Sequence, residues 1–113
     1  MKEMESLPHN RDAEETLLGQ LMIEPNLLDV VAEFVPKPEV FYNTHNRIIW
    51  NTIRKLQKED IGIDIVTVNE HIPKTQKKYI QAYYITGLAQ NIATTANALS
   101  HAKLIYEKWL LRR

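Results

Sequence analysis

The sequence predicts an all-α protein that folds as a compact bundle of about six helices. Apolar residues recur at helical spacing, as at Ala13, Leu17 and Leu21. Only 3 glycines occur among 113 residues, and no two alternating segments are joined by a turn typical of a β-hairpin. This length is sufficient for one domain with a hydrophobic core of its own.

Two helices are expected in the first third of the chain. Asn10 is placed to cap a helix over Asp12–Met22, and the neighbouring acids Glu14 and Glu15 suit the positive end of its dipole. Pro25 fits the first turn of a second helix that runs to about residue 34. The residues before this region, 1–8, are polar and are expected to form a flexible arm, which leaves 9–113 as the domain.

The middle of the chain is expected to contain one long helix and one short helix. The prolines at 36 and 38 break the chain, and 39–42 fits a single tight turn. Thr44 is expected to cap a third helix to about Gln57, with His45 in a structural role at its start. Asp64 is expected to cap a fourth helix that ends at Pro73, although β-branched residues leave a strand over 63–68 as an alternative.

Two further helices are predicted in the last third of the sequence. The apolar spacing of Ile80, Tyr84 and Leu88 predicts a fifth helix over Lys77–Ala89. The last helix is expected over 94–113, and because no glycine or proline ends it, we expect it to continue beyond the last residue.

The sequence contains no pattern that predicts catalysis within this chain. None of Gly19, Gly62 and Gly87 belongs to a phosphate-binding loop, so the usual means of hydrolysing ATP is absent and the chain is not expected to be an enzyme by itself. It has no cysteine, and its 4 histidines lack a metal-ligand spacing, so no cofactor or metal is expected in it. No secretory signal or membrane-length apolar run occurs, which predicts a cytoplasmic protein without membrane contact.

Aromatic and leucine residues near the end of the chain are candidates for protein contacts. Adjacent tyrosines on a helix cannot both be buried easily, and the last helix carries apolar residues on more than one face, which favours self-association. The candidate interface residues are Tyr83, Tyr84, Leu88, Leu99, Leu104, Ile105, Trp109 and Leu110.

A group of lysines also precedes three tyrosines around the expected start of the fifth helix. Lys74, Lys77 and Lys78 come before Tyr79, Tyr83 and Tyr84, a pattern that can bind single-stranded nucleic acid. An exposed lysine face is the favoured interpretation, because 14 basic residues balance 14 acidic ones and the net charge is zero.

An ordered set of short motifs runs from Leu7 to the last residue: Pro8-His9-Asn10, Ala13-Glu14, Leu17-Leu18-Gly19, Phe41-Tyr42 with His45 and Ile48-Ile49, Asp64-Ile65-Val66-Thr67-Val68, Tyr84-Ile85, Leu88-Ala89, Ala96-Asn97 with Ala102, and Glu107-Lys108 before Leu110-Leu111-Arg112-Arg113. This set resembles the N-terminal domain of the bacterial replicative DNA helicases, the DnaB family. The segment 74–82 departs from the family pattern, since it is shorter and basic where the family is acidic.

The resemblance implies a collar domain that precedes a linker helix and an ATPase domain. In such helicases the last two helices would form a hairpin that pairs subunits, and three pairs would build a hexameric ring. Primase would bind through its C-terminal domain, with Tyr84 as the best candidate contact. ATP, Mg and most DNA contacts would belong to the motor domain. The resemblance also implies structural roles for Phe41, His45 and Asp64.

Two other functions remain open from the sequence. A free-standing adaptor with the same fold could bind helicase or primase, since the helicase-binding domain of primase is similar in shape. A small domain that binds single-stranded nucleic acid through residues 74–84 is the third hypothesis.

Overall fold

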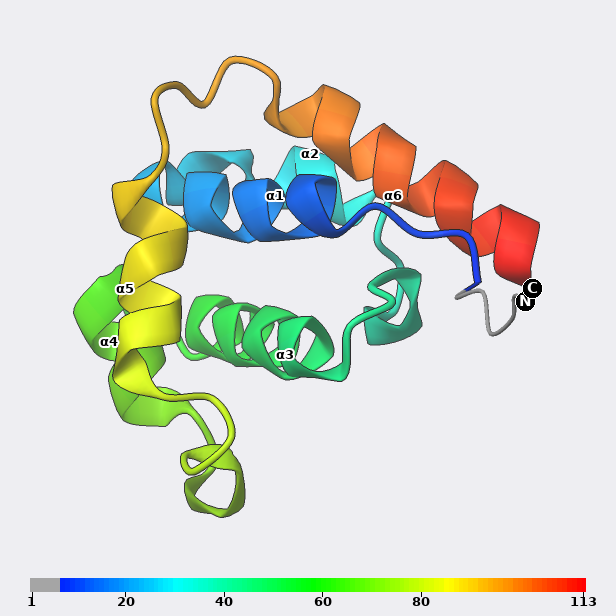
Figure 1. Cartoon of the computed structure of the whole chain (residues 1–113). Coiled ribbons are helices and arrows are strands. Elements are labelled where there is room, and N and C mark those ends of the chain that lie inside the picture. The colour runs from blue at the N-terminus through cyan, green and yellow to red at the C-terminus, as the bar shows by residue number, and fades with distance from the viewer. Residues whose placement is uncertain (1–6) are drawn as a thin grey trace.

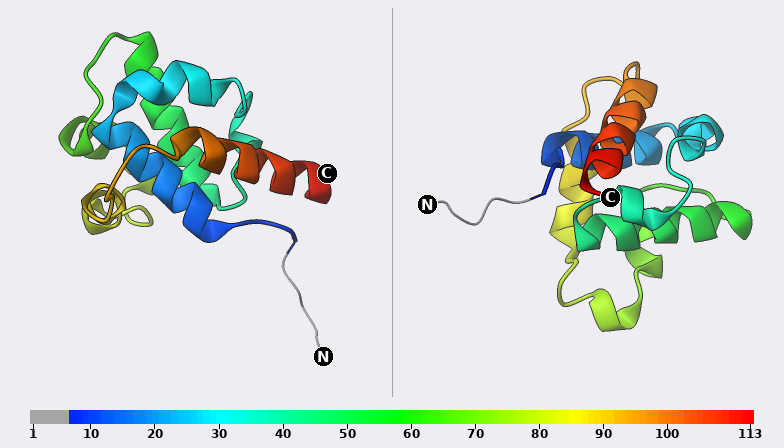
Figure 2. Two further views of the ribbon diagram at one scale, coloured as in Figure 1. Left: turned by 90° about the horizontal axis from the view of Figure 1, so that it is seen from above. Right: turned by 90° about the vertical axis from the view of Figure 1, so that its right-hand side faces the viewer.

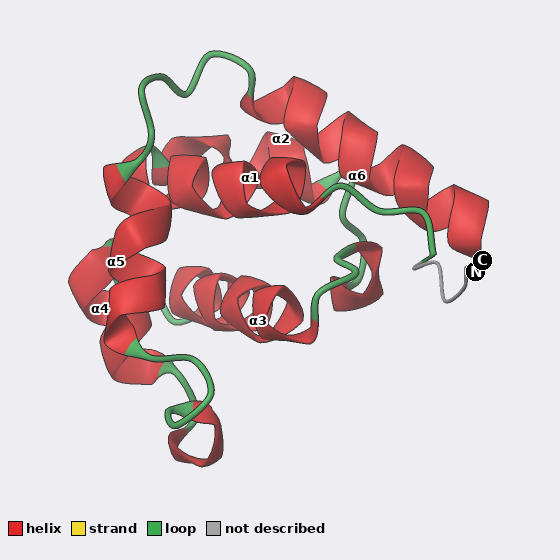
Figure 3. Cartoon of the chain, in the orientation of Figure 1, coloured by secondary structure: helices red, strands yellow, loops and turns green. Residues whose placement is uncertain are grey.

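Helix α1 is the centre of the structure, and three other helices pack around it (Figure 1). The computed structural model describes residues 7–113, which are helices and loops with no strand among them (Figure 3), so the all-α prediction is confirmed for this part of the chain. The helices are α1 Arg11–Ile23, α2 Leu28–Ala32, α3 Thr44–Lys58, α4 Ile65–His71, α5 Ala82–Gln90 and α6 Ala98–Arg112, with short 3-10 turns η1 Pro25–Leu27, η2 Pro38–Val40 and η3 Lys74–Gln76. Residues 1–6 of the expected flexible arm lie outside the described part. No helix within 7–113 is both long and apolar enough to cross a membrane.

The core forms between α1 and the helices that surround it. Leu17, Leu18 and Leu21 of α1 are fully buried, and α6 packs along α1 through its own buried residues, Ala102 and Ile105. Helix α3 lies on the other side of α1, and α5 crosses the end of this arrangement (Figures 1 and 2). The burial of one stripe from each helix explains why the apolar spacing in the sequence predicted these elements.

Helix α5 approaches α1 closely at Gly19. A Cβ atom at this position would lie 2.1 Å from the carbonyl oxygen of Leu88, far inside van der Waals contact. Gly19 therefore allows the two backbones to meet, which brings the side chains of α1 and α5 together along one side of the molecule.

The helix starts agree with the predicted caps in two of three cases. The Asn10 side chain accepts a hydrogen bond from Ala13 N, and Asp64 forms a capping box with Thr67. The segment after Asp64 is helical, so the alternative strand does not form. At α3 the cap is Asn43 rather than Thr44, which is the first helical residue, because the Asn43 side chain reaches the backbone nitrogens of the first turn.

The fifth helix is shorter than predicted. It begins at Ala82 rather than Lys77, and η3 and a series of turns precede it. Ile80 is buried although it lies outside the helix. Ile80 lies in a turn, whereas Tyr84 and Leu88 lie in the helix. All three residues face the core at helical spacing, and the sequence therefore suggested one longer helix. Residues 74–80 project from the body of the molecule (Figure 1).

The predicted hairpin of the last two helices is not present among residues 7–113. The loop 91–97 leads from α5 into α6, and the two helices diverge from it instead of running side by side (Figure 1). Each packs mainly on α1, because Ala98, Ala102 and Ile105 place the buried stripe of α6 against that helix. The last helix also starts later than expected, at Ala98.

Candidate functional site

An open groove lies between α1 and α5. Its volume is about 430 Å³. Helix α1 contributes its first turns, α5 contributes one face, and the start of the following loop completes the lining: Arg11, Asp12, Glu15, Thr16, Tyr83, Tyr84, Gly87, Leu88, Asn91 and Ile92. The groove exists because α1 and α5 touch at Gly19 and separate away from that point.

The walls of the groove combine an ion pair with apolar surface. Arg11 Nε donates to Glu15 Oε2 at 2.8 Å on the α1 side. On the α5 side Tyr83 is 75% exposed, and Leu88 is buried beneath the groove. A Cβ atom at Gly87 would meet no other atom within 4 Å, so the backbone of α5 is open to the groove there. These features suit contact with another protein, in which apolar surface and a few polar groups are combined.

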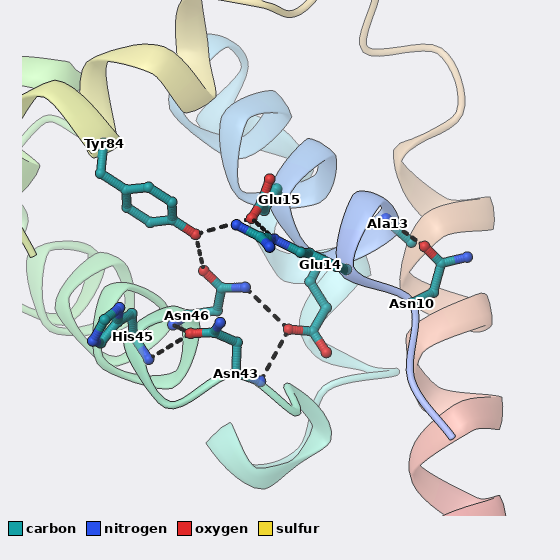
Figure 4. A network of polar contacts seen from close by, with 9 residues as sticks. Asn10, Ala13, Glu14, Glu15, Asn43, His45, Asn46 and Tyr84 are labelled. Carbon is teal, nitrogen blue, oxygen red and sulfur yellow. Dashed lines mark hydrogen bonds and ion pairs between the residues drawn. The ribbon is translucent and has the colours of Figure 1, made fainter. Parts of the chain in front are cut away.

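Tyr84 connects the groove wall to a buried polar network (Figure 4). Its hydroxyl donates to Asn46 Oδ1 at 2.8 Å and lies 3.4 Å from Glu15 Oε2. Burial of the phenol raises the pKa of Tyr84, and the negative charge of Glu15 raises it further, since both disfavour the phenolate. Tyr84 therefore holds α5 against α1 and α3 with its hydroxyl, while part of its ring faces the groove.

The centre of the network is the carboxylate of Glu14, which is only 1% exposed. Glu14 Oε2 accepts from Tyr42 N at 2.7 Å, and Glu14 Oε1 accepts from Asn46 Nδ2 at 3.0 Å and Asn43 N at 3.3 Å. The sequence-based explanation of this acid by the helix dipole is incomplete, because the carboxylate mainly satisfies donors of the loop before α3. Asn46 is fully buried as well, and no feature of the sequence indicated its role.

The predicted interface residues fall into three groups by burial. Tyr83, Leu99 and Leu110 are exposed and available to a partner. Tyr84, Leu104 and Trp109 are half-buried and pack against the core. Leu88 and Ile105 are buried, because their side chains face the core, which helical spacing alone does not show. Leu88 still forms part of the groove lining, and a protein contact through either residue stays a prediction.

The other sequence-based candidates lie apart from the groove floor. Lys74, Lys77 and Lys78 are exposed on the projecting segment, and Lys78 Nζ lies 5.1 Å from the ring centre of Tyr79. His45 is half-buried at the start of α3, where its backbone nitrogen donates to the Asn43 side chain at 2.8 Å. Within residues 7–113 no group of three or more His, Cys, Asp or Glu side chains gathers as a metal site would require.

The fold and the groove define an all-helical domain, in which buried polar groups hold the helices together and an open groove combines aromatic, apolar and charged side chains. Residues 6–107 match the family model described as the DnaB-like helicase N terminal domain. The chain therefore belongs to the DnaB-like helicase N-terminal domain family.

Individual relatives agree with this membership. The chain is 32% identical over 108 residues to the replicative DNA helicase DnaC of Bacillus subtilis, covering 94% of this chain and 24% of that protein. It is also 32% identical over 108 residues to the replicative DNA helicase DnaB of Rhodothermus marinus, covering 94% of this chain and 11% of that protein. The chain thus spans a quarter or less of the length of these two relatives. Among solved structures, the crystal structure of the N-terminal domain of DnaB helicase from Mycobacterium tuberculosis is similar, with a TM-score of 0.87 and 28% identity over 95% of this chain and 77% of that chain.

Proposed function

We propose that this chain serves as the N-terminal domain of a replicative, hexameric DNA helicase, encoded by a bacterium or a phage. In this role it supports ring assembly and binds the C-terminal domain of primase. ATP hydrolysis, Mg and most contacts with DNA belong to a motor domain that follows in the same protein. The observation that carries the proposal is the open α1–α5 groove, together with family membership.

Tyr83 is the residue in the groove with the properties of a binding anchor. It is 75% exposed, and a tyrosine that packs into a partner contributes a large rigid surface with a polar end. The hydroxyl of Tyr84 is already bonded to Asn46, so Tyr84 contributes chiefly its ring edge and the position of the helix. Primase contact is therefore assigned to Tyr83 first and to Tyr84 second.

Gly87 gives independent support for a ligand in the groove. A glycine inside a helix costs about 1 kcal/mol relative to alanine. Within residues 7–113, no atom outside the α5 backbone packs against Gly87 closely enough to require a glycine, since none lies within 4 Å of its Cβ position. A partner side chain that lies against the bare backbone of α5 would explain the glycine.

Calorimetric titration of this chain with the C-terminal domain of the primase from the same source tests the assignment. Tyr83→Ala should weaken binding by about 30-fold, the effect of losing an anchor worth about 2 kcal/mol. Tyr79→Ala is the matched control, because Tyr79 is 58% exposed but lies outside the groove. Gly87→Met should also weaken binding, since its side chain would fill the groove. Equal affinities for all three variants and the wild type would contradict the docking site.

Sequencing the reading frame that follows Arg113 tests the proposal that this chain is the N-terminal domain of a helicase. A linker and then a strand followed by a Gly-x-x-x-x-Gly-Lys-Ser/Thr loop would identify the motor domain. A stop codon at this position would favour the stand-alone adaptor, which would use the same groove.

A further inference from the structure

A separate hollow lies between the end of α6, the segment before α1 and the region from η2 to the start of α3. Its volume is about 200 Å³. Two aromatic residues and three arginines form most of its lining, with one acidic residue at the edge: Tyr42, Trp109, Arg47, Arg112, Arg113 and Glu39. This concentration of positive charge is unexpected in a chain whose net charge is zero.

Cationic side chains lie over both aromatic rings of the hollow. The Arg113 guanidinium carbon lies 4.9 Å from the Trp109 ring centre, and Lys37 Nζ lies 5.5 Å from the same ring. The Arg112 guanidinium carbon lies 5.3 Å from the ring centre of Tyr42. Contacts of this kind contribute only about 0.5–1 kcal/mol at exposed sites, so Lys37 and Arg113 can move to a stronger anionic partner.

Arg112 has a different role from the two exposed cations, because its guanidinium is already bonded. It donates to the carbonyl oxygens of Pro8 at 3.1 Å, Glu39 at 3.1 Å and Val40 at 2.8 Å. Burial lowers the pKa of Arg112; the negative charge of Glu14 opposes this shift, and the positive charge of Arg47 adds to it. An anion in the hollow would relieve this repulsion. Arg112 is thus a positioning residue that holds the chain around Tyr42.

We propose that this hollow, which we call the aromatic–basic hollow, binds single-stranded nucleic acid. Lys37, Arg113 and the terminal nitrogens of Arg47, whose Nε donates to the Phe41 carbonyl oxygen at 2.7 Å, contact backbone phosphates. One base stacks on the Trp109 ring. The combination of flexible cations with the half-buried ring of Trp109 suits such ligands, because phosphates alternate with π surfaces along the strand. An acidic peptide would use the cations but would not stack on the Trp109 ring, so nucleic acid is the favoured ligand.

Fluorescence anisotropy of a labelled oligothymidylate with the full 113-residue chain tests this site. Three phosphate contacts predict a salt slope of about −2, so affinity should fall roughly 15-fold between about 50 and 200 mM salt. The double variant Lys37→Gln/Arg113→Gln should bind at least about tenfold more weakly and show a shallower slope. Both side chains are exposed, so the variant should fold like the wild type.

Lys77→Gln/Lys78→Gln is the matched control, because it removes the same charge from the exposed segment before α5. This variant should bind the oligothymidylate like the wild type. Equal losses for the two double variants would show non-specific attraction and overturn the proposal, and a loss confined to the control would move the site to that segment.

Tryptophan fluorescence provides a readout that is independent of charge. Trp109 is half-buried at the hollow and Trp50 is buried in the core, so stacking of thymine should quench Trp109. Quenching should disappear in Trp109→Leu, with roughly tenfold weaker binding from the lost stack. No binding at about 50 mM salt would overturn the proposal, as would a polyglutamate peptide that competes equally well.

Discussion

The packing of α1 against α5 can be tested at two glycines, because Gly19 in α1 is crowded by neighbouring atoms and Gly87 in α5 is not. An alanine at Gly19 would place its Cβ 2.1 Å from the carbonyl oxygen of Leu88 and 2.9 Å from Ile92 Cδ1. The first of these atoms belongs to helical backbone and cannot rotate away. At Gly87, by contrast, an added Cβ would meet nothing within 4 Å. The same substitution therefore creates a clash in one helix and no contact in the other.

The expected magnitudes follow from these distances. Atoms in van der Waals contact lie about 3.5 Å apart, so Gly19→Ala requires α5 to move from α1 by more than about 1 Å. Overpacking of this kind costs about 3 kcal/mol, and the better helix propensity of alanine returns about 1 kcal/mol, which leaves a net loss of about 2 kcal/mol. Gly87→Ala should gain about 0.5–1 kcal/mol, because only the propensity term remains.

Thermal and urea unfolding of the two variants and the wild type measure this difference. For a domain of this size, Gly19→Ala should lower Tm by roughly 10 °C, and Gly87→Ala should raise it by a few degrees. A Gly19→Ala protein as stable as the wild type would refute the close approach of α1 and α5. A destabilised Gly87→Ala protein would show that the α5 backbone is not open, and the argument for a ligand against it would be lost.

Three further predictions concern the polar network and the surface of α6. Glu14→Gln should lower the free energy of unfolding by about 2–3 kcal/mol, because an amide cannot accept all three donors around it; urea unfolding that matches the wild type would contradict this. The raised pKa of Tyr84 keeps its phenol neutral in the folded state while the unfolded phenol ionises near pH 10, so stability should fall as pH rises above about 10. The fall should be shallower in Tyr84→Phe, as measured by urea unfolding at several alkaline pH values, and an equal fall would assign the effect to other groups. Self-association is expected at high protein concentration through α6, where Leu110 is 42% exposed, and Leu110→Glu should abolish it; sedimentation that shows only wild-type monomer would refute pairing by this helix.

The sequence predicted the helices whose ends carry a chemical signal. The side chains of Asn10 and Asp64 accept hydrogen bonds from the backbone nitrogens of Ala13 and Thr67, so local chemistry was enough to place α1 and α4. The start of α5 had no such signal, because Gln81 makes no side-chain cap bond. The apolar spacing then extended the helix back through Ile80, which is buried from a turn.

Tertiary packing determined the features that the sequence could not show. The stripe on α6 indicated a buried face but not its partner, and the partner is α1 rather than α5. Because α6 packs on α1, Ile105 lies in the core, and α5 and α6 do not form the predicted hairpin within residues 7–113. Similarly, Glu14 and Asn46 are far apart in sequence and bond only because α1 and α3 are neighbours, and no periodicity reveals that contact.

The buried polar network also gives Tyr83 and Tyr84 different roles, although the sequence predicted both as interface residues. From Tyr84 Oη a continuous series of hydrogen bonds runs through Asn46 to Glu14, and from Glu14 to the backbone of Tyr42. The groove wall and the aromatic–basic hollow are therefore held by one buried frame, although their linings share no residue. Removing Tyr84 leaves the Asn46 amide oxygen unsatisfied inside that frame and should cost stability as well as binding. Tyr83 is 75% exposed and lies outside this frame, so removing it should cost binding alone.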